Sequence, residues 1–396
     1  MNTQDRIYVD LTEYSSKYQG GVSTFARGIA IGLAKLAEKE GLRICLILEN
    51  KTEWNGLIED YNLDLSIITV NRPVRRRITN VLHRVNYNII NSYYVFALIK
   101  KLEFSHRIKY SLRNEVIYCP TTYLNLKVSN AFSIVSIHDC QEKRFPENFS
   151  RKQLLYRKYH LRFTLRNASI IQVSSKFISD ELKFYFPELL SNSNSPKICE
   201  IPEGVDIKFF HPQKYASREK TTDEILVPLS FHPHKNHQEL LEALKILDGK
   251  RSIRVYLTGE GPMKQKCIEF TNSFMTIDCQ FVGYVTREYL LELYQRVNVV
   301  VVTSKYESSS LPILESLACN TRVLASDIKP HIEAKYKLAL PIELYQLGNA
   351  RELANKLEHV LDLKNSKGIF RRVLPFSWEN IAEHYAVLFG QHQRSK

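Results

Sequence analysis

Long apolar runs are missing from this sequence. No stretch of about 18 or more apolar residues occurs, which excludes a transmembrane helix of ordinary length. The first residues, MNTQDRIYVDL, lack the basic and then apolar segments of a secretory signal, so we expect a cytoplasmic protein. Hydrophobic residues nevertheless make up 44% of the 396-residue chain. That content suffices for the buried cores of two domains.

Signals for metals and disulfides are also scarce. The seven cysteines are scattered without any Cys-x-x-Cys pair, so we expect reduced, buried thiols rather than a disulfide framework or a zinc site. His232, His234 and His237 stand close together but have no fourth ligand at compact spacing, which disfavours a metal there. The sequence also has no Asp-x-Asp pair. We therefore predict a protein that needs no metal and no other cofactor.

Acidic residues are sparse in the first half of the chain. Residues 1–200 contain 29 Lys and Arg against 19 Asp and Glu, whereas the remainder contains 26 against 23. The stretch 72–113 holds ten cations, among them Arg75, Arg76 and Arg77, and one acid. Because aromatic and aliphatic residues are interleaved with these cations, we interpret the stretch as a surface that docks on an anionic membrane. The alternative is a solvated helical face over a core formed by YYVFALI, and no recognised nucleic-acid module accompanies the charge.

Short strand-like runs alternate with amphipathic stretches along the chain. This alternation is typical of parallel α/β sheets, and it occurs in two series. The polar segment EIPEGVDIKFFHPQKYASREKTTDE separates the series, so we predict a first domain of residues 1–205 and a second of residues 206–375. The strand-like runs are RIYVDL, RICLILE, EVIYCP, SIVSIHD and ASIIQVSS in the first series, and EILVPLS, IRVYLTG, CQFVGY, NVVVVTS and TRVLAS in the second.

The segment YESSSLPILES places Glu307 and Glu315 on the two sides of a strand-to-helix turn. Ligands of open α/β sheets bind beyond the carboxyl ends of the strands, and this segment directly follows NVVVVTS. The backbone amides of Ser309, Ser310 and Leu311 are then available to an anion, and the two carboxylates to sugar hydroxyls. We expect Glu315 in the first helical turn. The alternative is an ordinary serine N-cap followed by an acidic first turn.

Three further sites carry polar or glycine residues next to expected strands and helices. Lys235, in FHPHKNHQELLEAL, precedes a helix-like stretch and can meet a diphosphate as a point charge. Gly20 and Gly21 stand before another helix, where they allow a ligand to approach the backbone. His138 ends a strand-like run and can present an imidazole to a ligand. Each also has a plain structural interpretation: an exposed helix turn, a tight turn, and a structural His beside a capping Asp.

Together these residues resemble the retaining GT-B glycosyltransferases of family 4, and the resemblance follows nearly the whole chain in motif order. It implies an α/β GT-B fold, in which two Rossmann-like domains face a central cleft. It also implies that a last helix, within residues 376–396, crosses back to the first domain. The segments that carry the resemblance are QGGVSTFARG, SIHDCQEKRFPENFS, IIQVSSKFISDEL, IPEGVD, PHKNH, GEGP, FVGYV, YESSSLPILES and PFSWENIAEHYAVLF.

The resemblance implies roles for the residues of YESSSLPILES. Glu307 contacts hydroxyls of the donor sugar, and Glu315 contacts the ribose of the nucleotide. The amides of Ser309, Ser310 and Leu311 hold the sugar and the distal phosphate. The family mechanism is a front-face displacement in which the leaving phosphate helps to deprotonate the acceptor, so Glu307 positions the donor and is not a nucleophile.

The resemblance also implies roles for residues elsewhere in the chain. Lys235 neutralises the leaving diphosphate. Gly20 and Gly21 belong to a loop that closes over that phosphate, His138 lies beside the reacting sugar, and Tyr284 lies near the nucleobase. The absence of Asp-x-Asp agrees with the metal independence of the family.

Two segments depart from the family pattern. Ser230 stands where the family often has an arginine, so either Lys235 carries the diphosphate with less help or another cation assists it. The family's Gly-Phe-Gly after the first glutamate is Ser308–Ser310 in this chain, which stiffens the loop and alters the contact with the donor sugar.

The sequence therefore predicts a retaining glycosyltransferase that moves a sugar from a nucleotide-sugar to a polysaccharide or a lipid-linked oligosaccharide, as in O-antigen, capsule or lipopolysaccharide synthesis. We expect it in the cytoplasm, at the inner face of the membrane, and not bound to nucleic acid. Two alternatives stay open: another GT-B enzyme such as a nucleotide-sugar epimerase, and a non-enzymatic protein that binds an anionic polymer.

Overall fold

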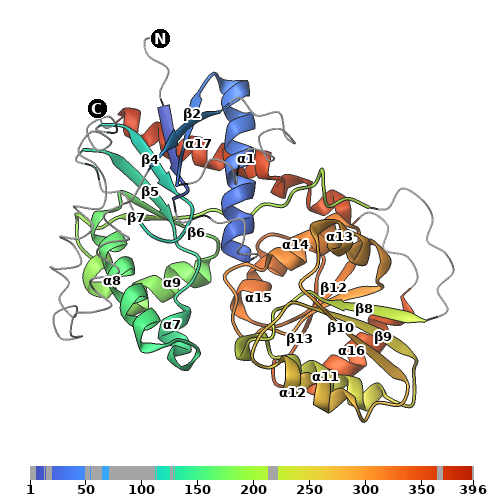
Figure 1. Cartoon of the computed structure of the whole chain (residues 1–396). Helices are drawn as coiled ribbons and strands as arrows, with labels where there is room; N and C mark the ends of the chain where they lie inside the picture. Colours follow the sequence, from blue (N-terminus) through green and yellow to red (C-terminus); the bar gives the residue numbers. More distant parts are fainter. Residues whose placement is uncertain are drawn as a thin grey trace. The chain divides into compact units, whose positions relative to one another are not determined.

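The structure, a computed structural model, divides into two compact units. Unit 1 comprises Met1–Glu203 and Trp378–Lys396, and unit 2 comprises Gly204–Ser377 (Figure 1). The boundaries expected from the sequence, after residues 205 and 375, lie two residues away from this division. The residues that the structure describes are 6–12, 14, 20–49, 54, 65–70, 112, 114–124, 128, 130–212, 222–363 and 369–394.

Unit 1 is built on a parallel sheet that has seven strands within the described residues, in the order β3-β2-β1-β4-β5-β6-β7. Its central strands are buried along almost their whole length, because helices cover both faces of a parallel sheet. The strands are β1 (Arg6–Asp10), β2 (Arg43–Leu48), β3 (Ser66–Thr69), β4 (Val116–Cys119), β5 (Phe132–Ser136), β6 (Ile170–Val173) and β7 (Lys197–Glu200).

Two long helices of unit 1, α1 and α17, lie against each other although they come from opposite ends of the chain (Figure 1). The Nζ atom of Lys35 lies 3.0 Å from Glu379 Oε1 across this contact. Gly28 and Gly32 of α1 permit the close approach, since a Cβ atom at either position would overlap Trp378 of α17. The helices of unit 1 are α1 (Gly21–Glu40), α7 (Gln141–Arg144), η1 (Pro146–Asn148), α8 (Arg151–Asn167), α9 (Lys176–Tyr185), α10 (Pro187–Leu190) and α17 (Trp378–Arg394).

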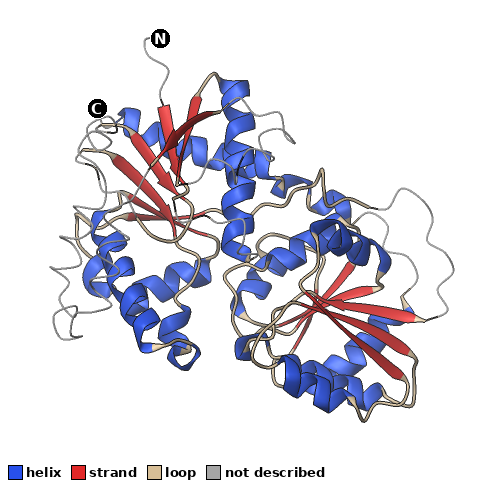
Figure 2. Cartoon of the chain, in the orientation of Figure 1, coloured by secondary structure: helices blue, strands red, loops and turns tan. Residues whose placement is uncertain are grey.

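Unit 2 is built on a second parallel sheet, which has six strands in the part of the chain that is described, in the order β10-β9-β8-β11-β12-β13. Figure 2 shows helices on both faces of this sheet. The strands are β8 (Asp223–Val227), β9 (Ile253–Thr258), β10 (Ile277–Gly283), β11 (Val299–Val302), β12 (Arg322–Ser326) and β13 (Glu343–Tyr345).

The helices of unit 2 follow its strands, as the alternating sequence pattern predicts. They are η2 (Pro233–Lys235), α11 (His237–Leu247), α12 (Lys264–Thr271), α13 (Arg287–Arg296), α14 (Leu311–Ala318), α15 (Lys329–Tyr336), α16 (Ala350–Asp362), η3 (Phe370–Arg372) and η4 (Leu374–Phe376). None of the helices described in either unit is both long and apolar enough to cross a bilayer.

Both sheets have a point at which the direction of strand addition reverses. In unit 1 it lies between β1 and β4, and in unit 2 between β8 and β11. Ligands of open parallel sheets bind in the crevice outside the carboxyl ends of such a strand pair, because the two following loops diverge there. These two positions are where a ligand site is expected.

Candidate functional site

The reversal point of unit 2 carries an ion pair. Lys235 ends η2, in the segment after β8, and Glu307 follows β11. The Lys235 Nζ atom lies 2.6 Å from Glu307 Oε1, and the two side chains are 18% and 13% exposed. Two backbone links join the same segments: Thr303 Oγ1 donates to the Lys235 carbonyl at 2.8 Å, and the Lys305 amide donates to the His234 carbonyl at 2.7 Å. Two of the sequence-predicted residues are thus held together.

The electrostatics of this pair keep Glu307 ionised. Burial alone raises the pKa of a carboxyl group, but the ammonium of Lys235 and the hydrogen bonds from Lys235 and Ser304 outweigh it, so the pKa of Glu307 lies below its ordinary value. Ser304 Oγ donates to the same oxygen, Oε1, at 2.6 Å. Glu307 is therefore an acceptor of hydrogen bonds, a role suited to sugar hydroxyls.

Three residues that the sequence analysis missed support Glu307. Besides the bond from Ser304 itself, Ser326 Oγ at the end of β12 donates to the Ser304 carbonyl at 2.6 Å. His331 is fully buried, and its Nδ1 atom donates to the Ser326 carbonyl at 2.8 Å. Burial lowers the pKa of His331, although the charge of Glu307 opposes this shift. Ser304 and Ser326 end the strand-like runs NVVVVTS and TRVLAS, which was their only sequence signal, and His331 had none.

Helix α14 begins where the sequence analysis places a helix start. Ser310, its N-cap, has a φ of 95°, a left-handed conformation that is rare for a residue other than glycine. The Ser310 hydroxyl is buried and has no hydrogen-bond partner, and Ser309 is half-buried. Leu311 is the first helical residue and Pro312 lies in the first turn, where its missing N–H costs nothing. The serine therefore does not act as an ordinary side-chain cap.

Glu315 is placed differently from our expectation. It is the fifth residue of α14 and so lies in the second turn rather than the first, because the helix already begins at Leu311. Tyr294 of α13 donates its hydroxyl to Glu315 Oε2 at 2.8 Å. Burial raises the pKa of Glu315, against the lowering effect of that hydrogen bond. The two glutamates of one motif thus have pKa values shifted in opposite directions.

Tyr284 lies at the end of β10, the edge strand of the sheet, and is 64% exposed. Gly283 before it has a φ of 71°, and its carbonyl accepts from the Gly259 amide at 2.6 Å. Gly261 packs on the Phe231 backbone so closely that no side chain fits. The GEGP and FVGYV segments therefore pack against the loop that precedes Lys235.

The candidate residues of unit 1 are Gly20, Gly21 and His138. Gly20 and Gly21 lie at the start of α1, are exposed, and a Cβ atom at either would meet nothing within 4 Å. His138 is buried, with Nε2 donating to the Pro120 carbonyl at 2.8 Å and its ring 4.6 Å from Phe25. Burial lowers the pKa of His138, which favours the neutral imidazole.

The histidines near Lys235 are structural in part. His237 is buried, stacks on Phe231 at 4.4 Å between ring centroids, and bonds the Leu229 carbonyl at 3.2 Å. Burial lowers the pKa of His237 to about 4. His232 and His234 stack on each other, with ring centroids 5.9 Å apart.

Within the described residues, no group of three or more His, Cys, Asp or Glu side chains is arranged to hold a metal ion. The seven cysteines are free thiols.

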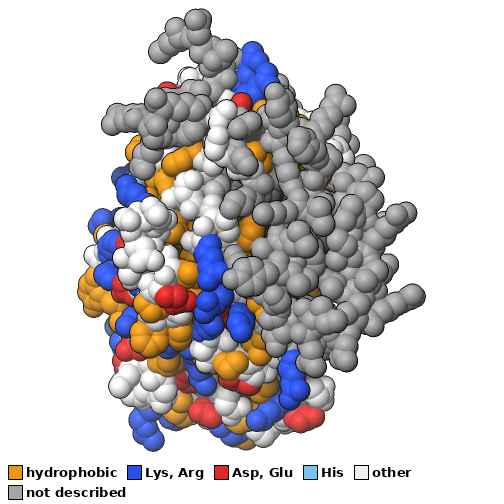
Figure 3. All heavy atoms as spheres, turned by 90° about the vertical axis from the view of Figure 1, so that its left-hand side faces the viewer, with side chains coloured by type: hydrophobic (Ala, Val, Ile, Leu, Met, Phe, Trp, Pro, Cys, Tyr) orange, Lys and Arg blue, Asp and Glu red, His pale blue; other side chains and the backbone are white. Residues whose placement is uncertain are grey.

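The predicted membrane surface lies almost entirely outside the described residues, Arg75, Arg76 and Arg77 included. The described part of unit 1 nevertheless has a basic helix of its own, α8, whose sequence RKQLLYRKYHLRFTLRN contains no acid. Figure 3 shows one face of the molecule on which Lys and Arg side chains lie among hydrophobic ones. Arg162 of α8 pairs with Glu188 at 3.2 Å, whereas Lys152 and Lys158 are exposed.

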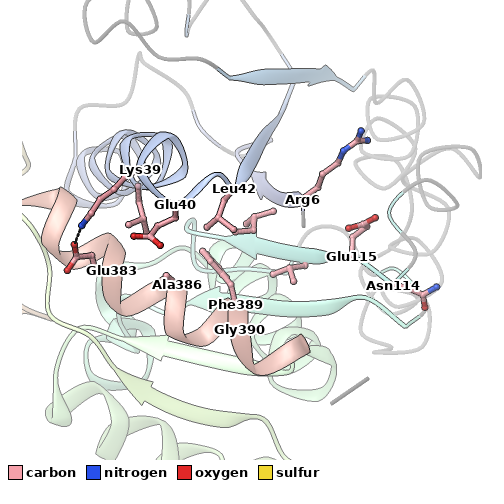
Figure 4. Close-up of a pocket in the computed structure, with 13 residues that line it drawn as sticks. Arg6, Lys39, Glu40, Leu42, Asn114, Glu115, Glu383, Ala386, Phe389 and Gly390 are labelled. Atoms are coloured by element: carbon pink, nitrogen blue, oxygen red, sulfur yellow. Dashed lines mark hydrogen bonds and ion pairs between the residues drawn. The ribbon is translucent and has the colours of Figure 1, made fainter. Parts of the chain in front are cut away.

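Unit 1 also contains a cavity of about 540 Å³ at the opposite end of its sheet. Arg6 and Val116, the first residues of β1 and β4, line it together with α1 and α17 (Figure 4). Its rim includes the ion pair between Lys39 and Glu383, which are 3.1 Å apart. Because it opens at the amino ends of the strands, this cavity is not where an α/β sheet places its active site.

Comparison with known proteins relates the second half of the chain to a described family. Residues 210–371 match the family model described as "Glycosyl transferases group 1". A GDP-mannose-dependent alpha-(1-6)-phosphatidylinositol dimannoside mannosyltransferase of Mycobacterium tuberculosis is 31% identical over 32% of this chain and 34% of its own length. The O-antigen chain mannosyltransferase RfbU of Salmonella typhimurium is 22% identical over 56% of this chain and 59% of its own length. The chain thus spans between about a third and three fifths of these relatives.

A solved structure extends the likeness to both units. Anabaena Alr3699/HepE, crystallised with UDP and glucose, superposes with a TM-score of 0.65 over 98% of this chain and 100% of its own, at 16% identity. That identity shows the fold alone. The chain therefore has the GT-B fold of two parallel α/β units, and its residues 210–371 match the glycosyl transferases group 1 family.

Proposed function

We propose that the chain is a retaining glycosyltransferase of family 4 that transfers a sugar from a nucleotide-sugar to a polysaccharide or a lipid-linked oligosaccharide. The observation that carries the proposal is the Lys235–Glu307 pair at the reversal point of unit 2, inside the region that matches the group 1 family. A cation and an ionised carboxylate at one strand edge suit a ligand that has both phosphates and hydroxyls.

Lys235 provides the positive charge for the departing nucleoside diphosphate. Its ammonium is already held 2.6 Å from Glu307, so it loses little side-chain freedom when the diphosphate arrives. Negative charge develops on the leaving phosphate in the transition state, and a cation fixed beside it stabilises that state more than the ground state. The amides of Ser309, Ser310 and Leu311 add donors at the start of α14.

The two carboxyl groups orient the donor. Glu307, ionised and supported by Ser304, accepts hydrogen bonds from hydroxyls of the transferred sugar. Glu315 accepts from the ribose, beside its bond from Tyr294. Tyr284, exposed at the sheet edge, lies near the nucleobase. In unit 1 we assign His138 to the reacting sugar and Gly20 and Gly21 to the phosphate, as the motif order suggests.

The names of the relatives narrow the substrates to test. One of them uses GDP-mannose, and the other acts on an O-antigen chain. We therefore propose GDP-mannose as the first donor to examine and a bacterial surface glycan as the acceptor. Transfer without a divalent metal is part of the proposal, supported by the lack of Asp-x-Asp. Activity is expected to survive EDTA, and a loss that magnesium restores would overturn this part.

We also propose that the protein works in the cytoplasm at the inner face of the membrane, where lipid-linked acceptors are exposed. The support is the cationic stretch 72–113 in the sequence and the acid-free helix α8. Co-sedimentation with vesicles that contain anionic lipid, compared for the natural protein and the triple variant R75Q/R76Q/R77Q, tests the docking. Vesicle binding that is the same with and without anionic lipid, and the same in the triple variant, would contradict the proposed docking.

A donor screen tests the function itself. UDP, GDP and their sugars are compared by thermal shift, because a ligand that binds only the folded state raises the Tm. The donor that binds is then incubated with the acceptor glycan, and NMR of the product reports the anomeric configuration. Transfer with retention supports the proposal. Conversion of the donor without transfer indicates the epimerase alternative, and salt-sensitive binding to anionic polymers without nucleotide-sugar affinity indicates the non-enzymatic one.

A further inference from the structure

An aromatic cluster lies in unit 1 close to His138. Tyr156 and His160, one turn apart on α8, stack with ring centroids 3.9 Å apart and an interplanar angle of 29°. Tyr123, from the loop after β4, meets Tyr156 edge-on at 5.9 Å and lies 5.1 Å from His160. His160 is buried and Tyr123 half-buried, yet Tyr156 remains 40% exposed. A large ring that is held in place by stacking and is still partly exposed is suited to receive a ligand.

The loop that carries Tyr123 is held in an unusual conformation. Thr122 has a φ of 75°, which a β-branched side chain rarely adopts. The loop is fixed on both sides of this residue: His138 Nε2 donates to the Pro120 carbonyl at 2.8 Å, and the Leu124 amide donates to Thr164 Oγ1 of α8 at 2.9 Å. Strained backbone that its surroundings hold in place is concentrated at ligand sites. The strain here positions the Tyr123 ring against α8.

Hydroxyl-binding groups surround the cluster. Arg157, next to Tyr156 on α8, pairs with Asp139 and with Glu142, the latter at 2.9 Å. These ion pairs hold both carboxylates against α8 beside Tyr156. Glu142 Oε1 and the Thr121 hydroxyl are both buried without a hydrogen-bond partner. Unpaired buried polar atoms are destabilising, so a ligand that brings hydroxyl donors and acceptors to this region is favoured.

From this geometry we infer that Tyr156, supported by Tyr123 and His160, is a stacking subsite for a pyranose ring of the acceptor glycan. This inference rests on the proposed transferase function. One face of a pyranose ring carries mainly C–H groups, which are weakly positive and apolar, and the face of an aromatic ring is negative and apolar. The hydroxyls at the rim of the sugar then lie toward the carboxylates and the arginine beside the cluster.

Saturation-transfer NMR with neutral methyl glycosides tests the subsite without any need for turnover. The probes are methyl α-D-mannopyranoside, methyl α-D-glucopyranoside and methyl α-D-galactopyranoside. Stacking predicts that the ring C–H protons of at least one probe receive the strongest saturation, and that added salt leaves the effect unchanged because the probes carry no charge. No saturation of any probe, or saturation confined to the methoxyl protons, would overturn the proposal.

Three variants test whether the aromatic ring of Tyr156 itself binds the sugar. Tyr156→Phe keeps the ring and is expected to retain the signal within about twofold. Tyr156→Leu keeps apolar bulk on the helix but removes the ring face, and we expect a loss of threefold or more. Tyr336→Ala removes a tyrosine of unit 2 that is 73% exposed and serves as the matched control. Equal signals in Tyr156→Leu and the natural protein, at unchanged Tm, would contradict the subsite.

Kinetics then distinguish failure of the subsite from failure of the function. In Tyr156→Leu the acceptor KM is expected to rise about tenfold, while the donor KM stays unchanged. If glycoside binding depends on Tyr156 but the protein transfers no sugar, the proposed transferase function is refuted and the carbohydrate subsite is supported. If the protein transfers sugar but Tyr156→Leu leaves the acceptor KM unchanged, the transferase function is supported and the subsite is refuted.

Discussion

The reversal points of the two sheets have the same topology but different chemistry. In unit 1 the residue that ends β1, Asp10, is completely buried and turns back to its own loop, where its Oδ1 atom accepts from the amide and the hydroxyl of Thr12 at 3.1 and 2.6 Å. The Oδ2 atom of Asp10 accepts from the thiol of Cys119 in β4 at 3.8 Å. In unit 2 the segments that follow β8 and β11 carry Lys235 and Glu307, which retain some exposure. A buried carboxylate held by neighbouring protein groups fixes a fold, whereas an accessible pair of opposite charges can exchange partners with a ligand. This contrast supports the proposal that the donor binds to unit 2.

The largest expected effect comes from breaking the charged pair. Lys235→Ala removes the cation beside the leaving diphosphate, and kcat/KM should fall about 100-fold, as is typical for the loss of one preorganised electrostatic contact. Glu307→Gln should cost about tenfold or more. Because the two side chains form one unit, the double variant should lose less than the product of both effects. Lys305→Ala, an exposed lysine in the same loop, is the control. Wild-type turnover in Lys235→Ala would refute the assignment.

A glycine inside unit 1 should matter for stability rather than chemistry. A Cβ atom at Gly32 would overlap the backbone carbonyl of Trp378, which no change of rotamer relieves. Gly32→Ala should therefore lower the free energy of unfolding by about 1–3 kcal/mol, although alanine is the better helix former. Denaturant unfolding measures this difference. An unchanged midpoint would show that α1 and α17 pack less tightly than described.

The opposite pKa shifts of the two glutamates make a pH-dependent prediction. The pKa of Glu307 is lowered in the folded state, so its contribution to stability is complete above the unfolded value, near 4.3, and is lost as the pH falls through the lower folded value. Glu307→Gln should thus cost about 1 kcal/mol at pH 7 and less below pH 4. The pKa of Glu315 is raised, so its ionisation weakens the fold as the pH rises, and Glu315→Gln should show the reverse trend. Parallel pH profiles for the two variants would contradict the described environments.

The smallest effect is expected at the glycine pair of unit 1. Gly21→Ala introduces a methyl group that meets nothing within 4 Å and should leave the Tm unchanged or slightly raised. If a ligand approaches this backbone, kcat/KM should nevertheless fall about threefold or more. Comparison with Gly32→Ala separates packing from function within the same helix. Full activity in Gly21→Ala would show that the glycine pair is not part of the site.

The sequence predicted the buried part of the fold better than its edges. All ten strand-like runs are strands in the structure, because continuous Val and Ile runs are distinctive when both sheet faces are covered. The strands that the analysis missed, β3, β7 and β13, are partly exposed edge strands of three or four residues. Short edge strands bury less apolar surface, so the sequence pattern that marks them is weak.

The site shows a similar division between what spacing predicts and what it does not. Lys235 and Glu307 were found because their positions after strands bring them to one sheet edge. The support from Ser304, Ser326 and His331 was missed, because it is a chain of hydrogen bonds between residues on different segments, two of which end on backbone carbonyls. The expected position of Glu315 in the first turn was wrong, because α14 already begins at Leu311, directly after the left-handed Ser310. Serine gives no sequence signal for that conformation.

Isothermal titration of a nucleoside diphosphate against its nucleoside tests the central claim most directly. GDP with guanosine, and UDP with uridine, are titrated into the natural protein and Lys235→Ala. We expect one diphosphate to bind the natural protein at least tenfold more tightly than its nucleoside, a difference of about 1.4 kcal/mol. In Lys235→Ala this difference should largely disappear while nucleoside affinity is kept. Equal losses for diphosphate and nucleoside, or no binding of either diphosphate to the natural protein, would contradict a donor site at the Lys235–Glu307 pair.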